Sequence, residues 1–68
     1  AARENARRSI VAAVDISGGT ILTEDMLTFK RPGTGISPRD LPRIMGRAAR
    51  TDIKKDSVLN WQMLTSNM

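Results

Sequence analysis

The stretch VAAVDISGGTILTEDML, residues 11–27, recurs later in the chain as AARTDIKKDSVLNWQML, residues 48–64. We call these stretches the first and second copies. At an offset of 37 residues, six of 17 positions are identical: Ala12/Ala49, Asp15/Asp52, Ile16/Ile53, Leu22/Leu59, Met26/Met63 and Leu27/Leu64. Two such units can pack about an internal pseudo-twofold axis, each covering the apolar side that the other cannot bury alone. A chance match is the alternative to this predicted repeat.

Each copy predicts the same local structure. A short strand ends at the shared Asp-Ile pair, the chain turns through small or polar residues, and a second short strand begins at Thr20 or Ser57. Thr23 or Asn60 can then cap one helical turn that brings the shared Met-Leu pair into the core. The repeat therefore predicts a mixed, mostly β chain with short helical turns.

The segment between the copies has a different pattern. A strand over residues 28–31 leads into a loop in which Pro32 biases Arg31 toward extended backbone. Gly33 and Gly35 permit either positive φ or close approach by another chain. We therefore expect a tight loop that holds Arg31 on a stiff backbone.

A helix-start signature follows this loop. Ser37 is a candidate N-cap, Pro38 suits the first helical position, and Asp40 completes a spacing like that of a capping box. Pro42 lies too far into the segment for an undisturbed α-helix, and Gly46 is a candidate C-terminal stop. One face carries the apolar residues Leu41, Ile44 and Met45. The pattern predicts one or two distorted turns between Pro38 and Met45.

Composition limits what the chain can do. With 68 residues it forms one domain at most, and such a small domain hides only about 60% of its unfolded surface. It has no cysteine and no histidine, so disulfides, common zinc sites and nucleophile–imidazole pairs are excluded. A complete enzyme within this chain is not expected. The longest apolar run, Ile10–Val14, is far shorter than the roughly 20 residues of a membrane span. We expect no membrane span or signal peptide, and a cytoplasmic location.

The net charge of +4 is concentrated in one part of the chain. Eight of the 11 cationic residues are arginine, and residues 39–55 carry six cations against two anions. The spacing of a basic helical stripe is shown by Arg39, Arg43, Arg47 and Arg50. Pro42 and Gly46 argue against an unbroken helix, and Phe29 and Trp61 alone do not make a stacking platform for nucleic acid. A solvated face, or docking onto an acidic partner, is favoured over nucleic-acid binding.

Several motifs together resemble a known module. They are NARRSIVA at residues 5–12, Asp15-Ile16 with Gly19, Thr23-Glu24-Asp25, and above all KRPGTGISP at residues 30–38. Over nearly all of its length the chain resembles the C-terminal antifreeze-like, or SAF, domain of bacterial sialic acid synthases (N-acetylneuraminate synthases), which is related to type III antifreeze proteins. The resemblance implies a SAF, or β-clip, "pretzel" fold with an internal dyad. It divides the chain into a linker from a preceding catalytic barrel, Ala1–Arg8, and a SAF domain, Ser9–Met68.

The resemblance also implies a function. Synthases of this family condense phosphoenolpyruvate with an N-acetylhexosamine such as N-acetylmannosamine, using a divalent metal, Mn or Mg, in an N-terminal TIM barrel. In a domain-swapped dimer, the SAF domain covers the barrel of the neighbouring subunit, and the arginine of its Arg-Pro-Gly loop contacts the N-acetyl group of the sugar. That arginine corresponds to Arg31, with Lys30 and Thr34 as candidates for support; Thr34 can alternatively satisfy only the turn. The resemblance implies no catalytic residue, metal ligand or cofactor in this domain, and no membrane partner.

Two other functions stay open, namely an ice-binding protein and a basic module that binds nucleic acid or saccharide. An ice-binding face must be flat and sparsely hydrated, whereas the first copy carries Asp15, Glu24 and Asp25, which hold water strongly. We therefore expect little thermal hysteresis. The equivalent positions of Asp15 and Asp52 before turns favour backbone hydrogen bonding over a catalytic carboxylate pair. Core or edge packing, and not a cofactor site, is expected for Met26, Met45, Met63 and Trp61.

Overall fold

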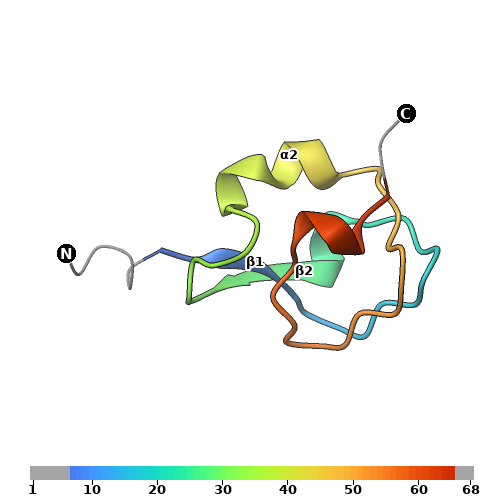
Figure 1. Ribbon diagram of the computed structural model, residues 1–68, viewed down its shortest axis with the longest axis horizontal. Coiled ribbons are helices and arrows are strands. Elements are labelled where there is room, and N and C mark those ends of the chain that lie inside the picture. The colour runs from blue at the N-terminus through green and yellow to red at the C-terminus, as the bar shows by residue number, and fades with distance from the viewer. Residues whose placement is uncertain (1–6, 66–68) are drawn as a thin grey trace.

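Two strands pair in the computed structural model, which describes residues 7–65 (Figure 1). β1 (Ser9–Ala12) runs antiparallel to β2 (Leu27–Lys30), and Ser9 lies opposite Lys30. β2 lies one residue earlier than the sequence predicts. Because β2 runs antiparallel to β1, the loop that follows β2 lies beside the start of β1.

β1 is covered along both edges. β2 pairs with one edge, and the second copy bonds to the other: Ala12 N–H donates to Ser57 O at 3.0 Å, and Leu59 N–H donates to Ile10 O at 2.9 Å. Every residue of β1 is buried. A strand enclosed in this way lacks the apolar-polar alternation of a half-exposed strand, which explains the nearly continuous apolar run SIVA.

Regular β-strands cover fewer residues than the sequence predicts. Outside β1 and β2, residues pair through isolated antiparallel bridges at Val11–Val58, Ile16–Ile53, Ile21–Ala48 and Ala49–Leu64. The expected strands ending at Asp15–Ile16 and Asp52–Ile53 are therefore wrong in extent. The chain turns too soon to continue them: Thr20 N–H already donates to Ser17 O at 3.1 Å, and the second copy closes the same turn. The described chain thus consists of one two-stranded sheet, extended segments and short helical turns.

The backbone hydrogen bonds of the two copies occur in matched sets 37 residues apart. Ile16 and Ile53, which are equivalent positions, donate to one another at 2.7 Å in each direction. Two further matched sets join the copies: Ala12 N–H to Ser57 O with Ala49 N–H to Thr20 O, and Asp56 N–H to Ala12 O with Gly19 N–H to Ala49 O. A matched bond within each copy joins Ala13 N–H to Met26 O and Arg50 N–H to Met63 O. Each copy therefore satisfies backbone groups of the other that burial would otherwise leave unpaired.

The aspartates before the two turns also bond between the copies. Gly18 N–H donates to Asp52 Oδ1, and Lys55 N–H donates to Asp15 Oδ1, each at 2.8 Å. This confirms the predicted backbone hydrogen bonding of the two carboxylates. Each aspartate holds the turn of the opposite copy, so the two turns are tied together.

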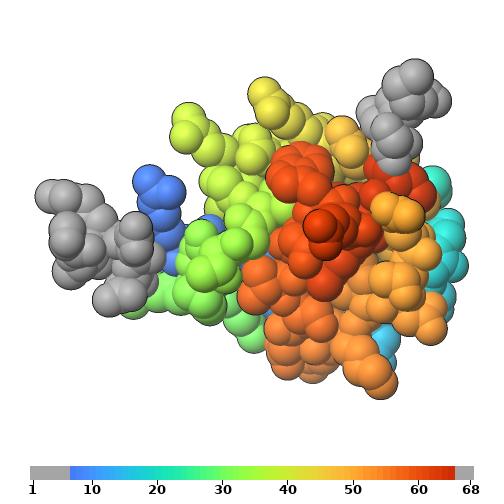
Figure 2. Space-filling model, in the orientation of Figure 1, coloured from blue at the N-terminus to red at the C-terminus, as the bar shows by residue number. Residues whose placement is uncertain are grey.

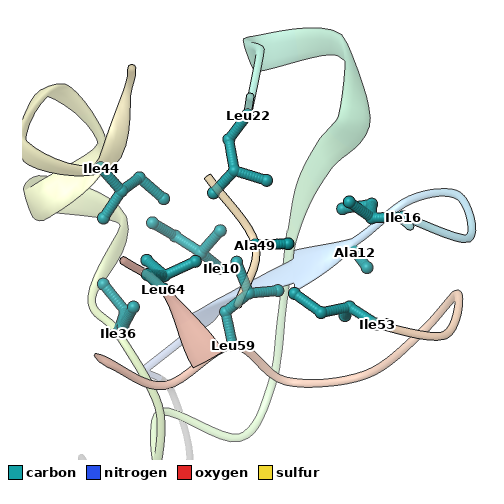
Figure 3. Close-up of a cluster of buried hydrophobic side chains, with 10 residues drawn as sticks. All are labelled: Ile10, Ala12, Ile16, Leu22, Ile36, Ile44, Ala49, Ile53, Leu59 and Leu64. Atoms are coloured by element: carbon teal, nitrogen blue, oxygen red, sulfur yellow. The ribbon is translucent and has the colours of Figure 1, made fainter. Parts of the chain in front are cut away.

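The core lies between the two copies and is closed by residues from the connecting segment (Figure 3). Its buried side chains are Ile10, Ala12, Ile16, Leu22, Ile36, Ile44, Ala49, Ile53, Leu59 and Leu64. Partly buried residues, including the predicted Met26, Met45 and Met63, pack against this cluster. The core is aliphatic, and it depends on both copies being present.

Trp61 is not part of the buried cluster and lies at the surface, which leaves the edge packing that the sequence also allowed. Its exposed fraction is 42%, and the Arg47 guanidinium lies 5.2 Å from its ring centroid. Trp61 begins its helical turn at the position that Glu24 occupies in the first copy, and Glu24 is exposed. The repeat thus assigns both residues to a surface position.

Each copy contains a single helical turn after its extended segment, as predicted. The 3-10 turns η1 (Glu24–Met26) and η3 (Trp61–Met63) begin after Thr23 and Asn60. The Asn60 side chain accepts the backbone N–H two residues ahead at 3.0 Å. Thr23 makes no such cap, because its hydroxyl donates to the Asp25 carboxylate at 2.6 Å.

The predicted distorted helical segment is present. A 3-10 turn, η2 (Pro38–Asp40), leads into the single α-turn α2 (Leu41–Ile44). Ser37 Oγ accepts the N–H of Arg39 at 3.3 Å, and the second proline lies in the first turn of α2, where it is tolerated. Gly46 has φ of +89°, as expected of a residue that ends a helix.

The basic helical stripe is not formed, because α2 ends at Ile44. Arg47 instead bends back, donating from Nε to Arg43 O at 3.0 Å and from Nη1 to Thr65 O at 3.3 Å. The arginines of this region therefore serve separate local structures.

The hydrogen bonds that Asp15 and Asp52 accept from the opposite turns can be tested in the 68-residue chain. We expect Asp52→Ala to lower the free energy of unfolding by about 0.5–1.5 kcal/mol, the usual net contribution of one hydrogen bond, and Asp52→Asn to lower it less because an acceptor oxygen is kept. Urea denaturation measures both. Glu24→Ala removes the same charge from an exposed position and is the control; an equal loss in this variant would show that net charge, not the tie, is responsible.

Candidate functional site

The loop over residues 31–35, called the Arg31 loop below, leaves β2 at the end of the sheet where β1 begins (Figure 1). Ser9 and Lys30 form the last pair of the ladder, so Arg8 and Arg31 lie just beyond it on neighbouring strand ends. Arg31 is exposed, and its peptide bond to Pro32 is cis. The start of the described chain (blue) and the segment that contains this loop (green) lie at the same end of the molecule in the space-filling view (Figure 2). That end therefore carries several arginines.

Ser9 fastens the Arg31 loop to β1. It is fully buried, and its hydroxyl donates to Pro32 O while accepting the N–H of Gly35 at 2.9 Å. One side chain thus satisfies a carbonyl and an amide on opposite sides of the loop. No sequence motif identifies this role of Ser9; its only signal is a polar residue at the first position of an otherwise apolar strand.

The two glycines of the Arg31 loop are required for close packing. A Cβ at Gly33 would collide with the Arg7 side chain, and a Cβ at Gly35 would collide with the Leu59 carbonyl and the Val58 side chain. Neither glycine has positive φ. Of the two predicted alternatives, close approach is therefore the correct one, and the approaching segments belong to this same chain.

Backbone bonds fix the far end of the loop. Ile36 N–H donates to Leu59 O at 3.0 Å, and Ile10 N–H donates to Ile36 O at 2.8 Å. Ile36 is itself buried. The loop is thus held between β1 and the second copy, while Arg31 stays exposed.

The residues predicted to support Arg31 lie in different surroundings. Lys30 Nζ is 3.0 Å from Asp56 Oδ1, in the turn of the second copy. This hydrogen bond, together with the charge of Lys30, lowers the pKa of the Asp56 carboxyl from its usual 3.8. Thr34 is exposed in the turn of the loop. Arg31 and Thr34 therefore share the loop, whereas Lys30 is engaged beside it.

A polar pocket of about 330 Å³ adjoins the loop. We call it the arginine pocket, and the residues that line it include Arg7, Arg8, Gly33, Gly35, Ser37 and Arg39. The glycines belong to the Arg31 loop, the first two arginines precede β1, and Arg39 belongs to η2. Three chain segments thus meet around this pocket.

Within residues 7–65, no three His, Cys, Asp or Glu side chains come together in a way that could hold a metal ion. In the same range, no helix has the length and apolar character needed to cross a membrane. What this part of the chain offers to a ligand at the loop is guanidinium groups, hydroxyls and backbone amides.

The family model of the SAF domain matches residues 7–65. This chain belongs to the SAF domain family. The resemblance inferred from the sequence motifs is thereby confirmed. The division into a linker, Ala1–Arg8, and a SAF domain, Ser9–Met68, stays a prediction, since residues 1–6 and 66–68 lie outside the described part of the chain.

Relatives of this SAF domain include much longer proteins. It is 42% identical over 59 residues to an uncharacterized protein of Methanocaldococcus jannaschii, covering 87% of this chain and 18% of that protein. It is 40% identical over 53 residues to an N,N'-diacetyllegionaminic acid synthase of Campylobacter jejuni, covering 78% of this chain and 16% of that protein. It is 32% identical over 68 residues to human N-acetylneuraminate-9-phosphate synthase, with 98% and 19% covered. The chain spans less than a fifth of the length of each.

A solved structure shares the fold. The solution structure of the antifreeze protein like domain in human N-acetylneuraminic acid phosphate synthase matches with a TM-score of 0.87 and 31% identity. The match covers 93% of this chain and 81% of that domain. The chain therefore has the antifreeze-like SAF fold.

The Ser9 contacts predict a localised loss of order. Ser9→Ala removes two partly buried hydrogen bonds, to the Pro32 carbonyl and from the Gly35 amide, which at about 0.5–1.5 kcal/mol each costs about 1–3 kcal/mol of unfolding free energy. We expect this loss in urea denaturation, with faster hydrogen exchange at the Gly35 amide. Ser17→Ala, at an exposed serine, is the control. Unchanged exchange at Gly35 in Ser9→Ala would contradict the role given to the hydroxyl.

The Lys30–Asp56 contact predicts an acid-sensitive contribution to stability. Because the folded-state pKa of Asp56 is lowered, the contribution is present above pH 3.8 and is lost as the pH falls through that lowered pKa. Carboxyl carbon NMR should give Asp56 a midpoint below 3.8, rising toward that value in Lys30→Met. Asp25, whose pKa is lowered mainly by the Thr23 hydroxyl, should keep its midpoint in that variant. An unmoved Asp56 would rule out the ion pair.

Proposed function

We propose that this SAF domain is the C-terminal part of a synthase that makes sialic acid or a related nonulosonic acid. In this proposal the domain covers the TIM-barrel active site of the neighbouring subunit in a domain-swapped dimer, and it contacts the barrel of its own subunit through the linker. The chemistry, condensation of phosphoenolpyruvate with an N-acetylhexosamine, belongs to the barrel. So does the divalent ion, Mn or Mg.

The observation that carries this proposal is an exposed Arg31 on a firmly held loop in a chain whose relatives include synthases of this class. Ser9, Leu59 and the two loop glycines restrain the backbone after Arg31, and the pairing of β2 with β1 restrains the backbone before it. A restrained backbone reduces the orientational freedom that must be lost when a substrate is held in a reactive geometry. The relatives are named as synthases of diacetyllegionaminic acid and of N-acetylneuraminate 9-phosphate.

In the proposed role, Arg31 donates hydrogen bonds to the amide oxygen of the sugar's N-acetyl group. A guanidinium stays charged at every working pH and presents planar, fixed donors, which a lysine ammonium does not. Arg31 would therefore position the substrate without taking part in bond making. Thr34 is close enough in sequence to assist, whereas Lys30 supports the loop indirectly through Asp56.

We further propose that the two copies are related by the internal pseudo-twofold axis inferred from the repeat. The matched hydrogen bonds between them support this relation. A cytoplasmic location accords with the chemistry proposed, and no membrane partner is invoked. Ice binding stays a less favoured alternative, since Asp15, Glu24 and Asp25 are all exposed.

The test is Arg31→Ala in a full-length synthase that carries this domain. We expect kcat/KM for the N-acetylated hexosamine to fall roughly 10- to 100-fold, because hydrogen bonds to charged groups contribute about 1.5–3 kcal/mol. KM for phosphoenolpyruvate should change little. Arg31→Lys keeps the charge but loses the planar donors, so its kcat/KM for the hexosamine should lie between those of wild type and Arg31→Ala. Steady-state kinetics with each substrate varied in turn measures these effects.

A matched control and a substrate analogue sharpen this test. Arg50→Ala removes an exposed arginine away from the loop and should leave kcat/KM unchanged. With a hexosamine that lacks the acetyl group, wild type and Arg31→Ala should react alike, since the interaction is absent from both. An unaltered efficiency of Arg31→Ala with the N-acetylated sugar would remove the proposed role.

A further inference from the structure

The arginine pocket is a second concave feature beside the Arg31 loop, and Arg31 is not among the residues described as lining it. Arg7 and Arg8 reach it from the chain that precedes β1, and Arg39 reaches it from η2. Three arginines line this pocket of about 330 Å³, and their charge gives a positive potential that a concave surface concentrates. The pocket is thus suited to an anion.

The acidic residue next to Arg39 in sequence pairs with an arginine outside the pocket. No acidic side chain is among the described residues that line the pocket. Asp40, next in sequence to Arg39, has its carboxylate 3.9 Å from Arg43 Nε. The ion pairs described within residues 7–65 are this one and Lys30–Asp56, so none of them neutralises the three pocket arginines.

The walls of the pocket are built by the packed part of the loop. The Arg7 backbone and Cβ lie against Gly33, and Gly35 is held by Ser9. Ser37 Oγ accepts an N–H from Arg39, which leaves its own hydroxyl hydrogen free to donate. The pocket is therefore lined by two glycines of a held loop together with Ser37 and three arginines.

We propose that the arginine pocket binds the phosphate group of a phosphorylated small molecule. Guanidinium groups bind phosphate through paired, charge-assisted hydrogen bonds, and three of them suit a dianion better than a single carboxylate. The volume of the pocket is at the lower end of the range for small-ligand sites. A recessed pocket of this size between the loop and η2 favours a small ligand over the acidic surface of a protein.

This proposal is independent of the role given to Arg31, because its readout is binding to the 68-residue chain and not synthase activity. The probes are inorganic phosphate and a hexose 6-phosphate, added at ionic strength matched by sodium chloride and followed by amide NMR. We expect saturable shifts at Gly33, Gly35 and Arg39 with both phosphates but not with chloride. The hexose phosphate should bind at least as tightly as phosphate, since it fills more of the pocket.

Variants locate the site. Arg39→Gln and the double change Arg7→Gln with Arg8→Gln should each weaken phosphate binding about tenfold or more, and a dispersed amide spectrum checks that each variant is folded. Arg39→Lys, which keeps the charge, should lose less. Arg50→Gln makes the same charge change outside the pocket and should alter affinity less than twofold.

Three results would overturn the proposal. One is equal shifts with phosphate and chloride, which would indicate only general screening. Another is equal weakening by Arg39→Gln and Arg50→Gln, which would indicate a diffuse charge effect. The third is tighter binding of a tricarboxylate such as citrate than of either phosphate, which would assign the pocket to carboxylate ligands.

Discussion

Backbone pairing along both edges of β1 is the constraint on which the rest of the structure depends. β2 occupies one edge and the second copy bonds to the other through Ser57 and Leu59. A domain of this size has few apolar side chains, so it gains much of its order from satisfying buried backbone groups. Since many buried backbone groups of each internal copy bond to the other copy, neither copy has a complete fold of its own.

The same arrangement determines how the candidate site is presented. Leu59 accepts from the end of the Arg31 loop and donates to β1, so the core and the loop share one residue. Ser9 adds a polar contact in a strand that is otherwise apolar. The loop is therefore an extension of the core, and only the side chains that it displays are free to interact with a ligand. In a protein of this size, a rigid binding loop is obtained most directly by packing it against the single available core.

Much of this architecture could be predicted from local patterns in the sequence. The repeat located the equivalent turns, the two aspartates and both 3-10 turns, because each depends on residue types at fixed spacing. The helix-start residues Ser37 and Pro38 similarly identified the distorted helical segment. The surface position of Trp61 also follows from the repeat, through its equivalence to Glu24, whereas its residue type alone leaves core and edge packing open.

Other features depend on contacts between distant residues and could not be predicted. The role of Ser9 requires knowing that the loop 26 residues away folds back onto it. The engagement of Lys30 by Asp56 likewise follows from the register of β1 with its neighbours. The extent of the strands was overestimated because alternating patterns do not reveal how soon each turn closes. The arginine pocket joins the two arginines before β1 with residues 33–39, which no motif in the sequence connects.

The contact between Arg7 and Gly33 has a mechanical consequence. Arg7 lies where the chain enters the domain, and its backbone rests directly on the loop that displays Arg31. Any pull or rotation transmitted along the incoming polypeptide must therefore reach that loop before it reaches the core. A displacement of the chain just before β1 would therefore act directly on the loop that displays Arg31.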